Sequence, residues 1–238
     1  MIIMSQSMPS RPRVVFEVIG ITLLALVLSL ALGVIFFIFL MVLGYGVETT
    51  FALGGATILG QIMFLVLAFI YIKNREITIP FDIPAISDLK YVGIGTVVTL
   101  VTAIATSQIL LYFDFMPESV IDEIAETSPI FLLVLAILSV VLIAPAEELL
   151  FRGAIQGRLR ERLGAFPAIA LASILFGSLH LFNYSGDILP IIMTTGLIVV
   201  IGGILGYLYE RTQNLAVPIL IHAIYNFVLL IPSYFAAV

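Results

Sequence analysis

The chain has 238 residues, of which 62% are apolar and only 11% are charged, and it contains neither Cys nor Trp. Soluble domains are about 45–50% apolar and about 25% charged, so this composition excludes most soluble folds, and it also excludes disorder, which requires few apolar residues. The missing Cys excludes disulfide scaffolds and Cys-ligated metal sites, and the net charge of −5 argues against nucleic acid as a partner.

Seven apolar runs are long enough to cross a bilayer, whose core of about 30 Å needs about 20 helical residues. In chain order they are 14–43, 49–72, 91–113, 130–151, 165–182, 188–209 and 215–234. The sequence therefore predicts a single all-α transmembrane domain over residues 1–238, a polytopic helical bundle of about seven spans. An eighth helix is allowed if 118–126 forms a short interfacial helix or if the first run is broken.

The first run could be a secretory signal, because Arg11 and Arg13 precede it. It is about 30 residues long, however, whereas the apolar region of a signal peptide has about 7–15. No clear small-x-small cleavage motif follows it. We therefore interpret residues 14–43 as a retained, tilted helix.

Basic residues alternate from one connection to the next. All of them lie before the first run or after runs two, four and six, whereas the connections after runs one, three and five have none. They are Arg11, Arg13, Lys73, Arg75, Lys90, Arg152, Arg158, Arg160, Arg162 and Arg211. The positive-inside rule then predicts a cytoplasmic N-terminus and an extracytoplasmic C-terminus. Because one span more or fewer would break the alternation, it also supports seven spans.

Two features concern the helices themselves. Pro145 predicts a kink in the fourth run, since its ring clashes with the preceding turn. Gly202 and Gly206 have the four-residue spacing that lets membrane helices approach closely, and we interpret them as packing residues.

Ionisable residues inside a membrane are costly, so each is a functional hypothesis by default. In this chain they concentrate in the second half, in three runs that also hold both histidines. The polar or motif positions are Glu147, Glu148 and Arg152 in run four, Phe176 and His180 in run five, and His222 and Asn226 in run seven.

Helix geometry pairs some of these residues. Residues four apart share a helix face, so Glu148 can pair with Arg152. For the same reason His222 and Asn226 can contact the same chemical group. Glu147 points about 100° away from Glu148 and has no local partner.

Helix geometry also predicts how deep each residue lies in the membrane. If runs four and five form a hairpin near Gly164, Glu147 lies 17 residues before the turn and His180 lies 16 after it. The two residues then lie at nearly the same depth. A shared cluster that includes His222 and opens toward the cytoplasm is then geometrically allowed.

The residue types indicate hydrolysis. Two carboxylates, two imidazoles and an amide, without a Ser or Cys nucleophile, favour attack by water. A Glu next to a His can act as general base, and N–H groups of His222 and Asn226 can stabilise an oxyanion.

The order Glu-Glu-x-x-x-Arg, Phe-x-x-x-His and His-x-x-x-Asn resembles the CAAX prenyl endopeptidase family, which includes the Ras-converting endopeptidase and the Abi-type bacteriocin-processing proteins. The resemblance covers a catalytic core of about 130–234. It implies a membrane protease without a metal or other cofactor, in which Glu147 and His180 activate water. It further implies that His222 and Asn226 form the oxyanion hole, while Glu148, Arg152 and Phe176 support the site. The implied partners are the bilayer and a protein or peptide substrate, in the best-known cases prenylated at its C-terminus.

Other interpretations stay open. The same residues could serve a zinc hydrolase, since zinc takes His and carboxylate ligands, although the sequence has no His-Glu-x-x-His motif. A non-enzymatic immunity or scaffold protein, or a transporter with a carboxylate–His relay, would also place such groups in a membrane. Each residue alone could also have a purely structural role, as an interfacial anchor, as a hydrogen-bonding side chain between helices or as a packing side chain.

Overall fold

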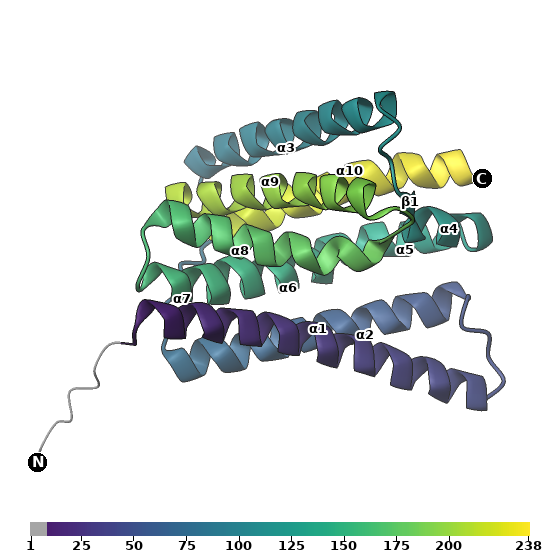
Figure 1. Cartoon of the computed structure of the whole chain (residues 1–238), viewed down its shortest axis with the longest axis horizontal. Coiled ribbons are helices and arrows are strands. Elements are labelled where there is room, and N and C mark those ends of the chain that lie inside the picture. Colours follow the sequence, from purple (N-terminus) through teal and green to yellow (C-terminus); the bar gives the residue numbers. More distant parts are fainter. Residues whose placement is uncertain (1–8) are drawn as a thin grey trace, which may run out of the picture.

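The apolar runs form the helices of an all-α bundle in the computed structural model, which describes residues 9–238 (Figure 1). Seven helical segments in this part of the chain are long and apolar enough to cross a membrane, which confirms the predicted fold class. They are α1 (Arg11–Val42), α2 (Thr50–Arg75), α3 (Ile86–Tyr112), a composite fourth span (Ile130–Arg160), a fifth span (Ala165–Asn183), α9 (Ile188–Thr212) and α10 (Ala216–Ala237).

The fourth span is not a uniform α-helix. It consists of α5 (Ile130–Leu138), the π-helical η1 (Ser139–Ile143), α6 (Ala144–Glu148), the π-helical η2 (Leu149–Gln156) and α7 (Gly157–Arg160). Pro145 lacks an N–H and crowds the turn before it, so the wider turn of η1 directly precedes the position where the sequence predicts a kink. Isolated π-helical turns are frequent at functional sites, and here they flank Glu147 and Glu148.

Short elements close one end of the bundle. The eighth helix that the sequence allows is present as α4 (Val120–Thr127), and the side chain of Ser119 accepts a hydrogen bond from the Asp122 N–H at its start. The strand β1 (Glu118–Ser119) pairs antiparallel with β2 (Tyr184–Ser185). This pairing ties the connection after α3 to the turn between α8 (Ala165–Leu179) and α9.

The helices pack as neighbouring pairs (Figure 1). The α1–α2 hairpin forms one side, and α2 lies against the fourth span. On the other side α8 pairs with α9, while α3 covers α9 and α10. The fourth span therefore lies between α2, α8 and α10, and residues at its middle face three other helices.

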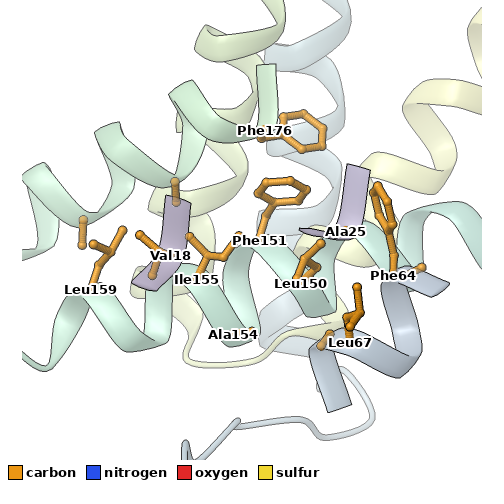
Figure 2. Packing of buried hydrophobic residues seen from close by; sticks show 14 of the residues in the cluster. Val18, Ala25, Phe64, Leu67, Leu150, Phe151, Ala154, Ile155, Leu159 and Phe176 are labelled. Carbon is orange, nitrogen blue, oxygen red and sulfur yellow. The ribbon is translucent and has the colours of Figure 1, made fainter. Parts of the chain in front are cut away.

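The largest buried apolar cluster surrounds that middle portion (Figure 2). Leu150 and Phe151 of η2 are fully buried in one cluster with Phe64 of α2, Val18 of α1 and Phe176 of α8. Between membrane helices such contacts stabilise through close van der Waals packing rather than through removal of water. Phe176 thus joins the core to the residues that the sequence analysis singles out.

Ion pairs join the basic ends of the helices. Glu17 of α1 accepts from Arg75 of α2 at 3.3 Å and from Arg158 of α7 at 2.9 Å. These ends lie on the left in Figure 1, opposite α4 and the C-terminal end of α10. One basic residue differs from the prediction: Arg152 does not follow the fourth span but lies inside it, only 1% exposed.

Two glycines of α9 lie where α8 approaches. A methyl group on Gly202 would lie 3.2 Å from the Phe176 ring, and one on Gly206 would lie 3.1 Å from Ile169. The packing role predicted from their spacing is therefore confirmed.

Candidate active site

Glu147 and Glu148 end the short helix α6, at the centre of the fourth span. Both are buried, but the Glu147 side chain keeps 11% of its surface exposed and the Glu148 side chain keeps none. The two side chains point in different directions, Glu147 toward Gln61 and Glu148 toward Arg152, and His222 lies near both.

Glu148 has two polar partners. Arg152 forms an ion pair with it, with Nε 3.0 Å from Oε2, and His222 donates a hydrogen bond from Nδ1 to Oε1 at 2.8 Å. Arg152 also donates from Nη2 to the carbonyl of Gly202 at 3.1 Å. Burying a carboxylate is costly unless it is paired and hydrogen-bonded, and Glu148 has an ion pair at Oε2 and a hydrogen bond at Oε1. The sequence predicted the Arg152 contact, whereas the His222 contact depends on how α10 sits against α6.

This contact fixes the tautomer of His222. A carboxylate only accepts, so Nδ1 of His222 is assigned as the donor; Nε2 then keeps its lone pair in the neutral ring and is a second donor in the imidazolium. That Nε2 lies 3.9 Å from Oε2 of Glu147. The distance is too long for a direct hydrogen bond, but catalytic contacts are often loose before substrate binds.

His180 lies at the junction between α8 and the 3-10 turn η3 (His180–Asn183) and is half-buried. Its Nδ1 is 3.0 Å from the Phe176 carbonyl, which can only accept, so Nδ1 donates and Nε2 keeps its lone pair.

Phe176 is the common surface for the polar residues. Its ring centroid is 4.9 Å from that of His180 and 5.8 Å from that of His222. The Arg152 guanidinium lies over the same ring, with Cζ 4.7 Å from the centroid. Both imidazoles, which come from different helices, are therefore packed on one aromatic side chain, which limits their rotation.

Glu147 has a partner that the sequence analysis missed. Gln61 of α2 donates from Nε2 to Oε1 of Glu147 at 3.1 Å. The signal in the sequence is an amide inside an otherwise apolar span, a placement that needs a polar partner. With Oε1 held by Gln61, Oε2 is the oxygen that faces His222.

Asn226 lies one turn after His222 on α10 and is half-buried. Among residues 9–238, no hydrogen bond to its side chain is formed, so both of its N–H donors are free. The structure thus brings Glu147, Glu148, Arg152, Phe176, His180 and His222 together, and it places Asn226 on the same helix as His222 without a direct contact to the others.

A metal would need ligands that are not otherwise engaged. Glu148 and Nδ1 of His222 bind one another, and Arg152 holds the second oxygen of Glu148. Within the part of the chain that the structure describes, no group of three or more His, Cys, Asp or Glu side chains is arranged to hold a metal ion.

Comparisons with known proteins point to the same region. Residues 129–228 match the family model described as type II CAAX prenyl endopeptidase Rce1-like. The chain is also 32% identical over 142 residues to the uncharacterized protein YpbD of Bacillus subtilis (strain 168), an alignment that covers 58% of this chain and 67% of that protein. No solved structure matches the chain. The matched region contains every residue of the three motifs, whereas Gln61 lies outside it.

Proposed function

The chain belongs to the Rce1-like family of type II CAAX prenyl endopeptidases, a family of membrane proteases, and we propose that it hydrolyses a peptide bond with water activated by Glu147 and His180. The observation that carries this proposal is the contrast between the two adjacent glutamates. Glu148 is fully buried, ion-paired with Arg152 and hydrogen-bonded to His222, whereas Oε2 of Glu147 accepts no hydrogen bond among the described residues and the Glu147 side chain is 11% exposed.

The free oxygen is suited to a general base. A water molecule near Oε2 of Glu147 and Nε2 of His180 would lose a proton to Glu147 as its oxygen attacks the substrate carbonyl. The resulting tetrahedral oxyanion collapses when the C–N bond breaks and the protonated Glu147 returns the proton to the leaving nitrogen. The neutral tautomer of His180, with Nδ1 held by a backbone carbonyl, leaves its other nitrogen to orient the water.

The oxyanion would be stabilised by Asn226 and His222. The free amide of Asn226 can donate directly, and one such donor is typically worth about 2.7–4 kcal/mol of transition-state stabilisation. His222 can donate from Nε2 only as an imidazolium, since its Nδ1 proton is committed to Glu148. The Glu148 carboxylate supplies the counter-charge for that state, which gives the Glu148–Arg152 pair a role in positioning and charge balance.

The substrate we propose is a membrane-associated protein or peptide C-terminus, of the prenylated CAAX type or similar. An apolar groove of about 600 Å³ between α3, α8 and α9 supports a lipid-bearing substrate. Its wall includes Ser173 and Gly203, which are close neighbours of Phe176 and Gly202 at the site.

We also propose that the N-terminus is cytoplasmic and that the site opens to the cytoplasm. The support is the shared position of the basic helix ends, where Glu17 joins Arg75 and Arg158, combined with the positive-inside rule.

The test is incubation of the purified protein with a prenylated CAAX peptide, with and without a chelator. We expect cleavage after the modified Cys that is insensitive to the chelator and is lost in Glu147→Gln and His180→Ala. Glu126→Gln, at an exposed position on α4, is the matched control and should cleave normally. Normal cleavage by folded Glu147→Gln would refute the mechanism, and loss of activity with chelator would favour the zinc alternative.

A further inference from the structure

Gln61 of α2 is the one polar contact to Glu147 that comes from outside the region matched by the family model, among the residues described. We propose that Gln61 is a positioning residue that holds the Glu147 carboxylate in the orientation needed for proton transfer. This inference rests on the proposed function, because it assigns Glu147 the role of general base.

The contact leaves the two carboxylate oxygens inequivalent. Oε1 accepts from Gln61 at 3.1 Å, so Oε2 is directed to the side of His222, whose Nε2 is 3.9 Å away. A carboxylate without this donor could rotate about its last bond and exchange the two oxygens. A misplacement of about 1 Å at a reacting group can cost on the order of 100-fold in rate, so a fixed orientation has a kinetic consequence.

The position of Gln61 is itself constrained by packing. The preceding residue, Gly60, faces α1 so closely that an added methyl group would lie 2.5 Å from Oγ of Ser29. This close approach sets the rotation of α2, which in turn packs against α6 and η2. The N-terminal hairpin therefore does more than cover the catalytic core, because it determines where the Gln61 amide points.

A purely structural role explains Gln61 poorly. The amide must present its NH₂ group to Glu147, since the carboxylate oxygens cannot donate, and this fixes Oε1 on the other side. That Oε1 is buried without a hydrogen-bond partner among the described residues. An apolar side chain of similar size would avoid the unsatisfied acceptor, so the amide is suited to its contact with Glu147 rather than to packing.

The chain contains a matched control. Gln156 of η2 is another glutamine whose Nε2 donates to a glutamate, Oε1 of Glu210 at 3.0 Å, and whose Oε1 is buried without a partner among residues 9–238. Its Nε2 also donates to the Gly206 carbonyl at 3.1 Å. Gln156→Met and Gln61→Met each remove an amide-to-glutamate hydrogen bond, and Gln156→Met removes the bond to Gly206 as well, but only Gln61→Met removes a contact of Glu147.

The experiment compares the kinetics of these variants on the prenylated peptide. Gln61→Met should lower kcat by on the order of 10- to 100-fold with little change in KM, whereas Gln156→Met should keep the wild-type kcat. Wild-type kcat in folded Gln61→Met would overturn the inference, as would a fall in kcat that Gln156→Met reproduces. If Glu147→Gln is inactive while Gln61→Met is not impaired, the inference alone fails. If Glu147→Gln stays active, the proposed function fails.

A second measurement does not depend on activity. Infrared spectroscopy of the membrane-reconstituted protein should contain a carboxylate band that disappears in Glu147→Gln. The band should shift in Gln61→Met and stay in place in Gln156→Met. An unshifted band in Gln61→Met would mean that the amide does not act on Glu147.

Discussion

The buried ion pair between Glu148 and Arg152 is best tested by replacing Arg152 with Met. The Glu148 side chain is fully buried and that of Arg152 is 1% exposed, so the change leaves a carboxylate in the protein interior with His222 as its remaining donor. Breaking a buried pair by removing one partner typically costs about 3–5 kcal/mol. We expect Arg152→Met to lower the free energy of unfolding by this amount and to abolish turnover.

The chain offers an exposed pair of the same type and spacing. Arg13 donates to Glu17, four residues on, at 3.2 Å, but the Arg13 side chain is 66% exposed. Exposed i,i+4 pairs contribute about 0.3–0.5 kcal/mol, and Glu17 would keep its contacts to Arg75 and Arg158. Arg13→Met should therefore change stability little, and the difference between the two variants measures the effect of burial.

A double-mutant cycle separates pairing from packing. Glu148→Gln removes the charge from the other side, and the double variant Glu148→Gln, Arg152→Met removes both charges. Replacing a whole buried pair by neutral groups is often far less costly than removing one partner, so the double variant should be more stable than the sum of the single effects predicts. The assay is reversible unfolding of the purified variants in detergent micelles. Additivity within about 0.5 kcal/mol would refute the claim that the two residues are energetically coupled.

Two further predictions concern α8, α9 and α10. In Gly177→Ala the new methyl group would collide with the Val199 side chain and lie 3.3 Å from the Thr195 carbonyl. Because α8 and α9 must then separate, both the melting temperature and turnover should fall. Gly196→Ala on α9 meets nothing within 4 Å and should stay within about 1 kcal/mol of wild type, so equal effects at both glycines would contradict the packing argument. Asn226→Ala should reduce kcat by about 100- to 1000-fold with little effect on KM, and an unchanged kcat with a raised KM would remove Asn226 from the oxyanion hole.

The fold was largely predictable because a bilayer imposes length and apolarity on each span. The prediction was weakest for the fourth span, which was expected to end near Phe151 and instead continues to Arg160. Arg152 was expected to follow the membrane span, but it is buried inside it, and its charge is balanced by Glu148 on the same span. A paired charge inside a helix has the same sequence pattern as a charge at a helix end.

The site was predictable only in its local contacts. The Glu148–Arg152 pair follows from four-residue spacing, and it is observed at 3.0 Å. The contacts of Glu148 with His222 and of Glu147 with Gln61 link residues 74 and 86 positions apart. They depend on the rotation of α10 and α2 about their axes, which the π-helical turns of the fourth span also affect. The spacing of residues along one sequence contains no information on how these helices are rotated about their axes.

In the mechanism that we propose, the two adjacent glutamates have different roles. Glu148 faces a guanidinium and an imidazole N–H and has no exposed surface, so in the proposed mechanism it orients these groups and takes no part in proton transfer. Glu147 receives a hydrogen bond from the neutral amide of Gln61, and no cation lies within ion-pairing distance among the residues described, apart from His222 when that ring is protonated. We propose that its carboxylate accepts and returns the proton, a transfer that breaks no ion pair to Arg or Lys. The division of roles follows from the roughly 100° between neighbouring residues on a helix, which directs one glutamate to α10 and Arg152 and the other to α2.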